Sequence, residues 1–300
     1  MSLGLTLGLI AALCWGSTDV SAALAGRRLG SLRVAAIVQL TSLAAVLALC
    51  VIRSSGLPAK PEDTLASVIN GAVASCAYLA FFTALRIGPV SVVTPVVAAY
   101  GGLTVVLAVI FRGEALAPLQ AVGATVATAG VILTGLVSDR GWRGARIVGR
   151  GVGFAVVAML CFAVLTVGLA GPIRSAGWLP VLLVSRTANA ATVWTILAAV
   201  LATRARVAAP LLAPALDKAP ISRRAAVGAA LVGGVLDIAG FVAFAVGLEQ
   251  APTWIVGLAS SFGPIVSVLV AVVLWGERLQ RSQWVGLAGI AAGLVAVALP

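Results

Sequence analysis

Histidine is absent from this 300-residue sequence, and only 10% of the residues are charged. A soluble domain carries roughly 25% charged residues, so this chain has too few to cover a water-exposed surface. The lack of histidine removes the usual metal ligand and the usual proton shuttle at neutral pH. No metal-ligand cluster or nucleophile–base arrangement replaces it. The sequence therefore argues against an enzyme, and we expect no cofactor.

Cysteine is also scarce, and all four cysteines fall within apolar segments without paired spacing. This pattern indicates neither a disulfide framework nor a zinc site and favours buried small hydrophobic side chains. No Gly-x-x-x-x-Gly-Lys phosphate loop is present, so we expect no ATP hydrolysis by this chain. The net charge of +11 comes from basic residues spread over short loops. That distribution suits anionic lipid headgroups, and it does not indicate nucleic-acid binding.

Long apolar segments dominate the chain, which is 61% hydrophobic and has a mean hydropathy of +1.15. A helix needs about 20 apolar residues to cross a bilayer. These segments therefore predict an all-α integral membrane protein with ten transmembrane helices. The ten ranges are 3–24, 34–52, 65–85, 90–111, 117–137, 152–173, 179–202, 225–248, 254–275 and 284–299.

An internal repeat relates segments three to five to segments eight to ten. A shift of 163 residues places Gly113-Glu114 on Gly276-Glu277 and Pro89 on Pro252. We therefore expect two five-helix units, residues 1–138 and 147–300. Because each unit crosses the membrane an odd number of times, the second must lie upside down. Duplicated units of this kind are typical of transporters.

Basic residues divide unequally between the two sets of connections. The connections after segments one, three, five, seven and nine carry 15 Lys and Arg residues, and the opposite set carries four. The positive-inside rule places the richer set in the cytoplasm of a plasma-membrane protein. Both termini would then lie on the same, extracytoplasmic side.

The run Leu13-Cys14-Trp15-Gly16-Ser17, the repeated proline and the repeated Gly-Glu resemble EamA-type proteins of the drug/metabolite transporter superfamily. The resemblance covers essentially the whole chain. It implies a ten-helix inverted-repeat carrier with a central cavity that exports, or less often imports, small metabolites, amino acids or drugs. It also implies cytoplasmic termini, against the charge count. Asp19 departs from the family, in which many members carry an apolar or amide residue there.

Three charged residues, Asp237, Arg186 and Asp19, lie within apolar segments, where a charge is costly unless it faces a cavity or a partner. Asp237 lies mid-span in segment eight and shares a helix face with Phe241. It either binds a cation or proton, or pairs with a nearby base. Arg186 shares a face with Asn189 and aligns with Gln39 of the first unit. It either clamps a substrate carboxylate or phosphate, or pairs with Asp237.

Further candidates lie in segments one, three and four. Asp19 follows Trp15 by one helical turn. It either lies at a wet cavity mouth or, because burial disfavours the charged carboxylate, exchanges a proton for substrate. Aromatic residues either stack on a ligand or pack between helices, and Tyr78 aligns with Phe241 of the second unit. The remaining candidates are Ser17 and Tyr100.

Other features are interpreted as structural. Glu114 and Glu277 precede segments five and ten, where a carboxylate favours the positive end of a helix. Pro89, Pro95 and Pro252, together with a further proline at position 264, break or kink helices. Gly-x-x-x-Gly pairs favour close packing within the molecule.

The leading functional hypothesis is a secondary transporter of a small solute, working by alternating access, as a monomer or homodimer in the lipid bilayer. Its site would lie between segments one to four and six to nine, with proton coupling through Asp237 or Asp19. A flippase for lipid or polyprenyl-linked substrates, with Arg186 contacting a phosphate, is the alternative. A membrane-embedded enzyme is a more remote one.

Overall fold

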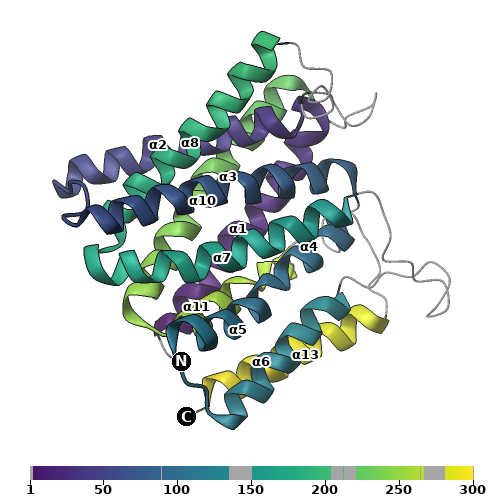
Figure 1. The fold of residues 1–300 in the computed structure, drawn as a ribbon. Helices are drawn as coiled ribbons and strands as arrows, with labels where there is room; N and C mark the ends of the chain where they lie inside the picture. The colour runs from purple at the N-terminus through teal and green to yellow at the C-terminus, as the bar shows by residue number, and fades with distance from the viewer. Residues whose placement is uncertain are drawn as a thin grey trace.

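The computed structural model describes residues 3–88, 90–134, 151–203, 212, 221–263, 265–266 and 281–299. These residues form helices almost throughout (Figure 1). The helices are α1 Leu3–Leu29, α2 Ser31–Arg53, α3 Pro61–Ile87, α4 Val90–Ala98, α5 Tyr100–Arg112, α6 Pro118–Thr134, α7 Val152–Ala176, α8 Trp178–Thr203, α10 Arg223–Gln250, α11 Thr253–Ser260 and α13 Arg281–Ala298.

Length and composition suit these helices to a bilayer. In the described part of the chain, seven helical stretches are long and apolar enough to cross a membrane, and Val93–Arg112, from α4 into α5, counts as one of them. The apolar helices α6 and α13 are shorter. Leucine and valine side chains also lie exposed on the outer faces of the helices. Such a surface is stable in lipid, so the chain is a multi-pass membrane protein.

Most helices run past the predicted ends of the apolar segments. The first, for example, continues beyond residue 24 through Arg27 and Arg28 to Leu29. Basic residues interact favourably with the negative end of a helix, so charge there does not end it. Segment five is described as far as Thr134 and segment nine as far as Val266. The remaining residues of those two segments lie outside the described ranges.

Segment four is not one regular helix, because it breaks at Ala99 between α4 and α5. Pro95 lies inside α4, and its missing N–H removes one hydrogen bond from the turn that precedes it. In the second unit α11 ends at Ser260, and Ser261 and Phe262 form a turn. Under the shift of 163 residues, Ala99 corresponds to Phe262. The break therefore recurs at the same place in both units.

Helices of the first unit pack mainly on helices of the second. The pairs are α1 with α10, α3 with α7, α2 with α8, and α6 with α13. Figure 1 shows α6 and α13 as a pair along one side of the other helices, with both chain ends at the same end of the molecule. Glycine permits the α6–α13 contact: a Cβ added at Gly123 would lie 2.9 Å from the Gly293 carbonyl oxygen. Gly289 and Gly293 therefore pack internally, as expected.

Candidate functional site

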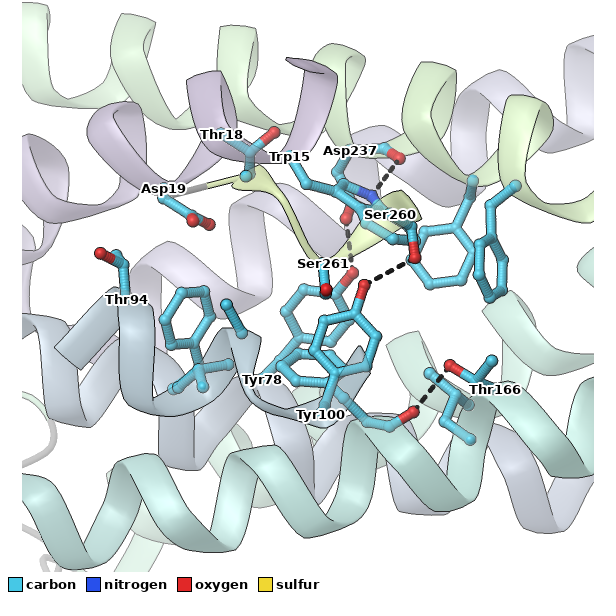
Figure 2. Close-up of a pocket in the computed structure, with 18 of the residues that line it drawn as sticks. Trp15, Thr18, Asp19, Tyr78, Thr94, Tyr100, Thr166, Asp237, Ser260 and Ser261 are labelled. Carbon is cyan, nitrogen blue, oxygen red and sulfur yellow. Dashed lines mark hydrogen bonds between the residues drawn. The ribbon is translucent and has the colours of Figure 1, made fainter. Parts of the chain in front are cut away.

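A cavity lies between the two units, at the level where the helices break (Figure 2). The volume that the centres of water molecules can occupy in it is about 70 Å³. This is several times the roughly 10–15 Å³ that one water needs. Most of its wall is aromatic or aliphatic. The lining residues are Trp15, Thr18, Asp19, Tyr78, Phe81, Phe82, Thr94, Val97, Ala98, Tyr100, Phe162, Leu165, Thr166, Asp237, Phe241, Phe244, Ser260, Ser261 and Gly263.

The described lining residues come from α1, α3, α4, α5, α7, α10, α11 and the turn after α11. None of them belongs to α2 or α8, so the prediction that segments two and seven line the cavity was wrong for the described residues. Polar side chains of α2 and α8 lie behind the wall instead. Ser42 and Arg186 contact the lining residue Asp237, and Arg186 also packs against the Phe241 ring.

Asp237 is fully buried and surrounded by partners. Its Oδ2 accepts hydrogen bonds from Ser42 Oγ at 2.8 Å and from Arg186 Nη1 at 3.1 Å. Its Oδ1 accepts one from the Tyr78 hydroxyl at 2.5 Å. Trp15 Nε1 donates to its backbone oxygen at 3.3 Å. Side chains from four other helices thus meet at this one residue of α10, and its negative charge is balanced by the Arg186 guanidinium.

Arg186 is not among the lining residues of the cavity and is only 2% exposed. Its Nη1 also donates to Gln39 Oε1 at 3.0 Å, and Asn189 Nδ2 donates to the same oxygen at 3.1 Å. The guanidinium carbon lies 3.5 Å from the centre of the Phe241 ring, a cation–π contact. The structure therefore contains the Arg186–Asp237 pairing that the sequence left open, inside a network formed with Gln39 and Asn189.

Asp19 has different surroundings, although it lines the same cavity. Its side chain is half-buried. No hydrogen bond or ion pair joins its carboxylate to another described residue. Figure 2 shows this carboxylate pointing into the space between α1 and α4, near Thr18 and Thr94. Among the charged groups of the described wall, Asp19 is thus the one whose carboxylate oxygens can still accept hydrogen bonds from a ligand.

Aromatic rings pair crosswise between the units. Trp15 of α1 lies 4.9 Å from Phe241 of α10, centroid to centroid, and Phe162 of α7 lies 5.6 Å from Tyr78 of α3. Trp15 corresponds to Phe162 under a shift of 147 residues, and Tyr78 corresponds to Phe241 under the shift of 163. Both separations fall in the favourable range for ring pairs. The same aromatic arrangement is therefore built twice around the cavity.

Of the two remaining predicted site residues, one lines the cavity and the other does not. Tyr100 lines the cavity, and its hydroxyl lies 2.8 Å from Ser260 Oγ. Ser17 is not among the lining residues: its hydroxyl donates to the Leu13 carbonyl within α1 at 2.9 Å.

Sequence reasoning missed several hydroxyl-bearing residues of the wall, because serine and threonine are common in apolar helices and carry no spacing signal of their own. Only Ser260 and Ser261 had a signal, since they directly precede Phe262, Gly263 and a proline, a combination that favours a turn. The missed residues are Thr18, Thr94, Thr166, Ser260 and Ser261. No group of three or more cysteine or acidic side chains in the described ranges is placed to hold a metal ion.

Glu114 does not cap the helix that follows it, contrary to the sequence interpretation. Its carboxylate accepts hydrogen bonds from the backbone N–H groups of Thr253 and Trp254, both at 3.0 Å, at the start of α11. It also forms an ion pair with Arg174 of α7 at 3.2 Å. Gln120 Oε1 instead accepts a hydrogen bond from the Ala117 N–H just ahead of α6. Glu114 therefore joins the two units, and Glu277 lies outside the described residues.

The pKa of Glu114 is lowered from its ordinary value of 4.5. Burial alone raises the pKa of this carboxyl, but hydrogen bonds from the Thr253 side chain, the Thr253 and Trp254 N–H groups and Arg174 outweigh burial. Each of these donors stabilises the charged form. Glu114 is thus held as an anion by the positive end of α11.

Comparison with known proteins identifies this architecture. The sequence model of the EamA-like transporter family matches residues 2–136 and 149–299, nearly the whole chain. The chain belongs to the EamA-like transporter family. One solved crystal structure has a similar fold, with a TM-score of 0.75 and 18% identity, over 98% of this chain and 96% of that chain. No curated protein matches.

Family membership confirms the resemblance drawn from the tryptophan, proline and Gly-Glu motifs. Proteins of this family are membrane transporters of the drug/metabolite type and not enzymes, and they act on small solutes within a lipid bilayer. The structural likeness at 18% identity concerns the fold alone.

Proposed function

We propose that this protein is a secondary transporter that exports a small metabolite, amino acid or drug-like solute by alternating access. Ten membrane spans, in two inverted five-helix units, would carry the cavity between them. Family membership supports transport, and the crosswise packing of the units supports a site between them. The outward direction is the one that the family resemblance implies.

The observation that carries this proposal is the cavity, with Asp19 as a carboxylate open to a ligand. A rocking motion of α1 and α10 against α3 and α7 would open the cavity to either side in turn. Its position at the helix breaks suits a carrier, because irregular backbone at membrane depth is tolerated where it lines a cavity.

Proton coupling is assigned to Asp19 and not to Asp237. The other titratable or charged groups at the cavity are Asp237, Tyr78 and Tyr100, with Arg186 behind Asp237. A proton on Asp237 would remove the negative charge that balances Arg186 and weaken the hydrogen bonds from Tyr78 and Ser42. A proton on Asp19 displaces no described partner. Asp19 therefore suits exchange of a proton for substrate.

The flippase alternative needs Arg186 free to contact a phosphate. The guanidinium is buried, paired with Asp237 and covered by Phe241. A phosphate would therefore have to reach a buried guanidinium whose charge is already balanced by Asp237. This geometry favours the solute carrier.

Reconstituted vesicles test the carrier. The protein is placed in liposomes that contain a pH-sensitive dye, and panels of amines, amino acids, nucleosides and sugars are added. We expect at least one solute to move protons through the native protein and through Glu62→Gln, which changes an exposed carboxylate at the start of α3. Asp19→Asn should abolish the proton signal. Proton movement that survives Asp19→Asn would overturn the coupling, and no solute movement at all would overturn the carrier.

A further inference from the structure

Six hydroxyl groups in the described wall of the cavity donate their hydrogens to other protein groups. Ser260 and Ser261 donate to the Gly257 and Leu258 carbonyls at 2.9 and 2.7 Å. Because the Ser260 hydrogen is committed to that carbonyl, Tyr100 is the donor in the Tyr100–Ser260 contact. Tyr78 donates to Asp237.

Both α1 and α7 follow the same pattern. Thr18 Oγ1 lies 3.0 Å from the Cys14 carbonyl and 3.2 Å from the Gly233 carbonyl, and Thr166 donates to the Phe162 carbonyl at 2.9 Å. The Trp15 N–H is also committed, to the Asp237 backbone. What these lining groups still offer a ligand is oxygen lone pairs, which accept hydrogen bonds. The cavity is therefore better supplied with acceptors than with donors.

The charge of the wall agrees with this hydrogen-bond pattern. Arg186 and Asp237 compensate one another, whereas no described residue pairs with Asp19. An ionised Asp19 thus leaves one uncompensated negative charge in an apolar setting. A cation that enters would be held strongly there, because a charge pair is screened weakly away from water. An anion would meet a like charge and a shortage of donors.

The rest of the wall selects for an apolar body. Trp15, Phe81, Phe82, Phe162 and Phe244 present rings to the cavity. Ring faces attract cations and bury hydrocarbon. The ligand that matches all three properties carries a positive N–H group on an apolar or aromatic frame.

We propose that the cavity binds a protonated organic amine, with its ammonium group donating to the Asp19 carboxylate and its apolar body between the aromatic rings. This inference rests on the proposed function only in that the same cavity carries the solute. Binding itself requires no transport.

Four ligands with the same phenyl ring and different charge provide the test: phenethylamine, phenylalanine, 3-phenylpropionate and 2-phenylethanol. Binding to the full-length protein in detergent is measured by calorimetry and by the shift in melting temperature. We expect phenethylamine to bind at least tenfold more tightly than the other three. The neutral alcohol controls for partition of the ring into detergent. Stronger binding of 3-phenylpropionate or phenylalanine would overturn the proposal, even without a variant.

Variants then locate the ammonium group. Asp19→Asn should weaken phenethylamine binding at least tenfold, whereas Asp19→Glu and the control Glu62→Gln should retain it. Size-exclusion chromatography checks that each variant is folded. If Asp19→Asn does not fold, Asp19→Glu and the charge series of the native protein still decide the matter. Unchanged binding in folded Asp19→Asn would overturn the assignment.

Flux measurements separate this inference from the carrier proposal. Phenethylamine that binds through Asp19 in a protein that moves no solute faster than protein-free liposomes do supports the amine site and contradicts the carrier. A different solute that drives proton movement while phenethylamine fails to bind supports the carrier and contradicts the amine site.

Discussion

Arg186 donates from Nη1 to Asp237 Oδ2 over 3.1 Å, joining α8 to α10 at a point where both side chains are almost completely buried. Removing either charge leaves the other buried without its partner. We expect Arg186→Gln or Asp237→Asn to lower the free energy of unfolding by about 3–5 kcal/mol. Unfolding titrations in mixed detergent micelles measure the loss.

The double variant is the informative control. Arg186→Gln combined with Asp237→Asn removes both charges and retains groups able to bond with Gln39, Ser42 and Tyr78. We expect the double variant to lose about 0.5–3 kcal/mol less unfolding free energy than the two single losses added together. Additive losses would mean that the two charges do not stabilise one another.

Close packing of α6 on α13 gives a second prediction. A Cβ at Gly123 would lie 2.8 Å from the Ala296 Cβ, closer than two carbon atoms tolerate. Gly123→Ala should therefore destabilise the protein by about 1–3 kcal/mol. Gly228→Ala is the matched control, since nothing lies within 4 Å of a Cβ added there. It should be neutral or stabilising by up to ~1 kcal/mol. Equal melting temperatures for the two variants would contradict the packing.

Acid should weaken the connection made by Glu114. Its folded-state pKa lies below the ordinary value of 4.5, so the charged form stabilises the folded protein. That stability is complete above pH 4.5 and is lost as the pH falls from 4.5 through the folded-state pKa. Melting temperatures between pH 7 and pH 3 measure it.

Substitution isolates the Glu114 contribution. Glu114→Gln should lower the melting temperature at pH 7 and flatten its fall in acid, while Glu62→Gln should follow the native curve. If the melting temperatures of the native protein and of Glu114→Gln fall in parallel between pH 7 and pH 3, the Glu114 carboxylate does not cause the pH dependence of stability.

Membrane orientation is tested with single cysteines in a cysteine-free background. Glu62 lies at the start of α3 and Arg281 at the start of α13, and both are exposed. The charge count predicts that Glu62→Cys reacts with an impermeant reagent in intact cells and that Arg281→Cys reacts only after permeabilisation. The reverse pattern would support the cytoplasmic termini implied by the family resemblance.

The sequence was most informative about the helices and least informative about how side chains pair. Apolar runs and the repeat around Glu114 and Glu277 located the helices, because hydrophobicity is a property of each segment alone. The prolines of segment four indicated an irregular helix, but they did not locate the break at Ala99, which lies after Pro95. The partner of Glu114, by contrast, lies more than a hundred residues away in α11 and has no local signal.

Within the site, Asp19 and Asp237 look alike in sequence, since each is a carboxylate in an apolar helix. Their different roles come from Arg186, Tyr78 and Ser42, which converge on Asp237 only in the folded chain. The pattern of donors and acceptors around the cavity depends in the same way on which carbonyl each hydroxyl reaches. Such pairing follows from packing, which periodicity does not report.

The crosswise ring pairs also make the two units depend on each other. Trp15 meets Phe241 and Phe162 meets Tyr78, so each unit holds one member of each pair and lacks the other. A change to a ring in one unit therefore alters a contact made by the other unit. The units can differ in charge, as Asp237 and its counterpart Ala74 do, but neither unit can enclose the cavity alone.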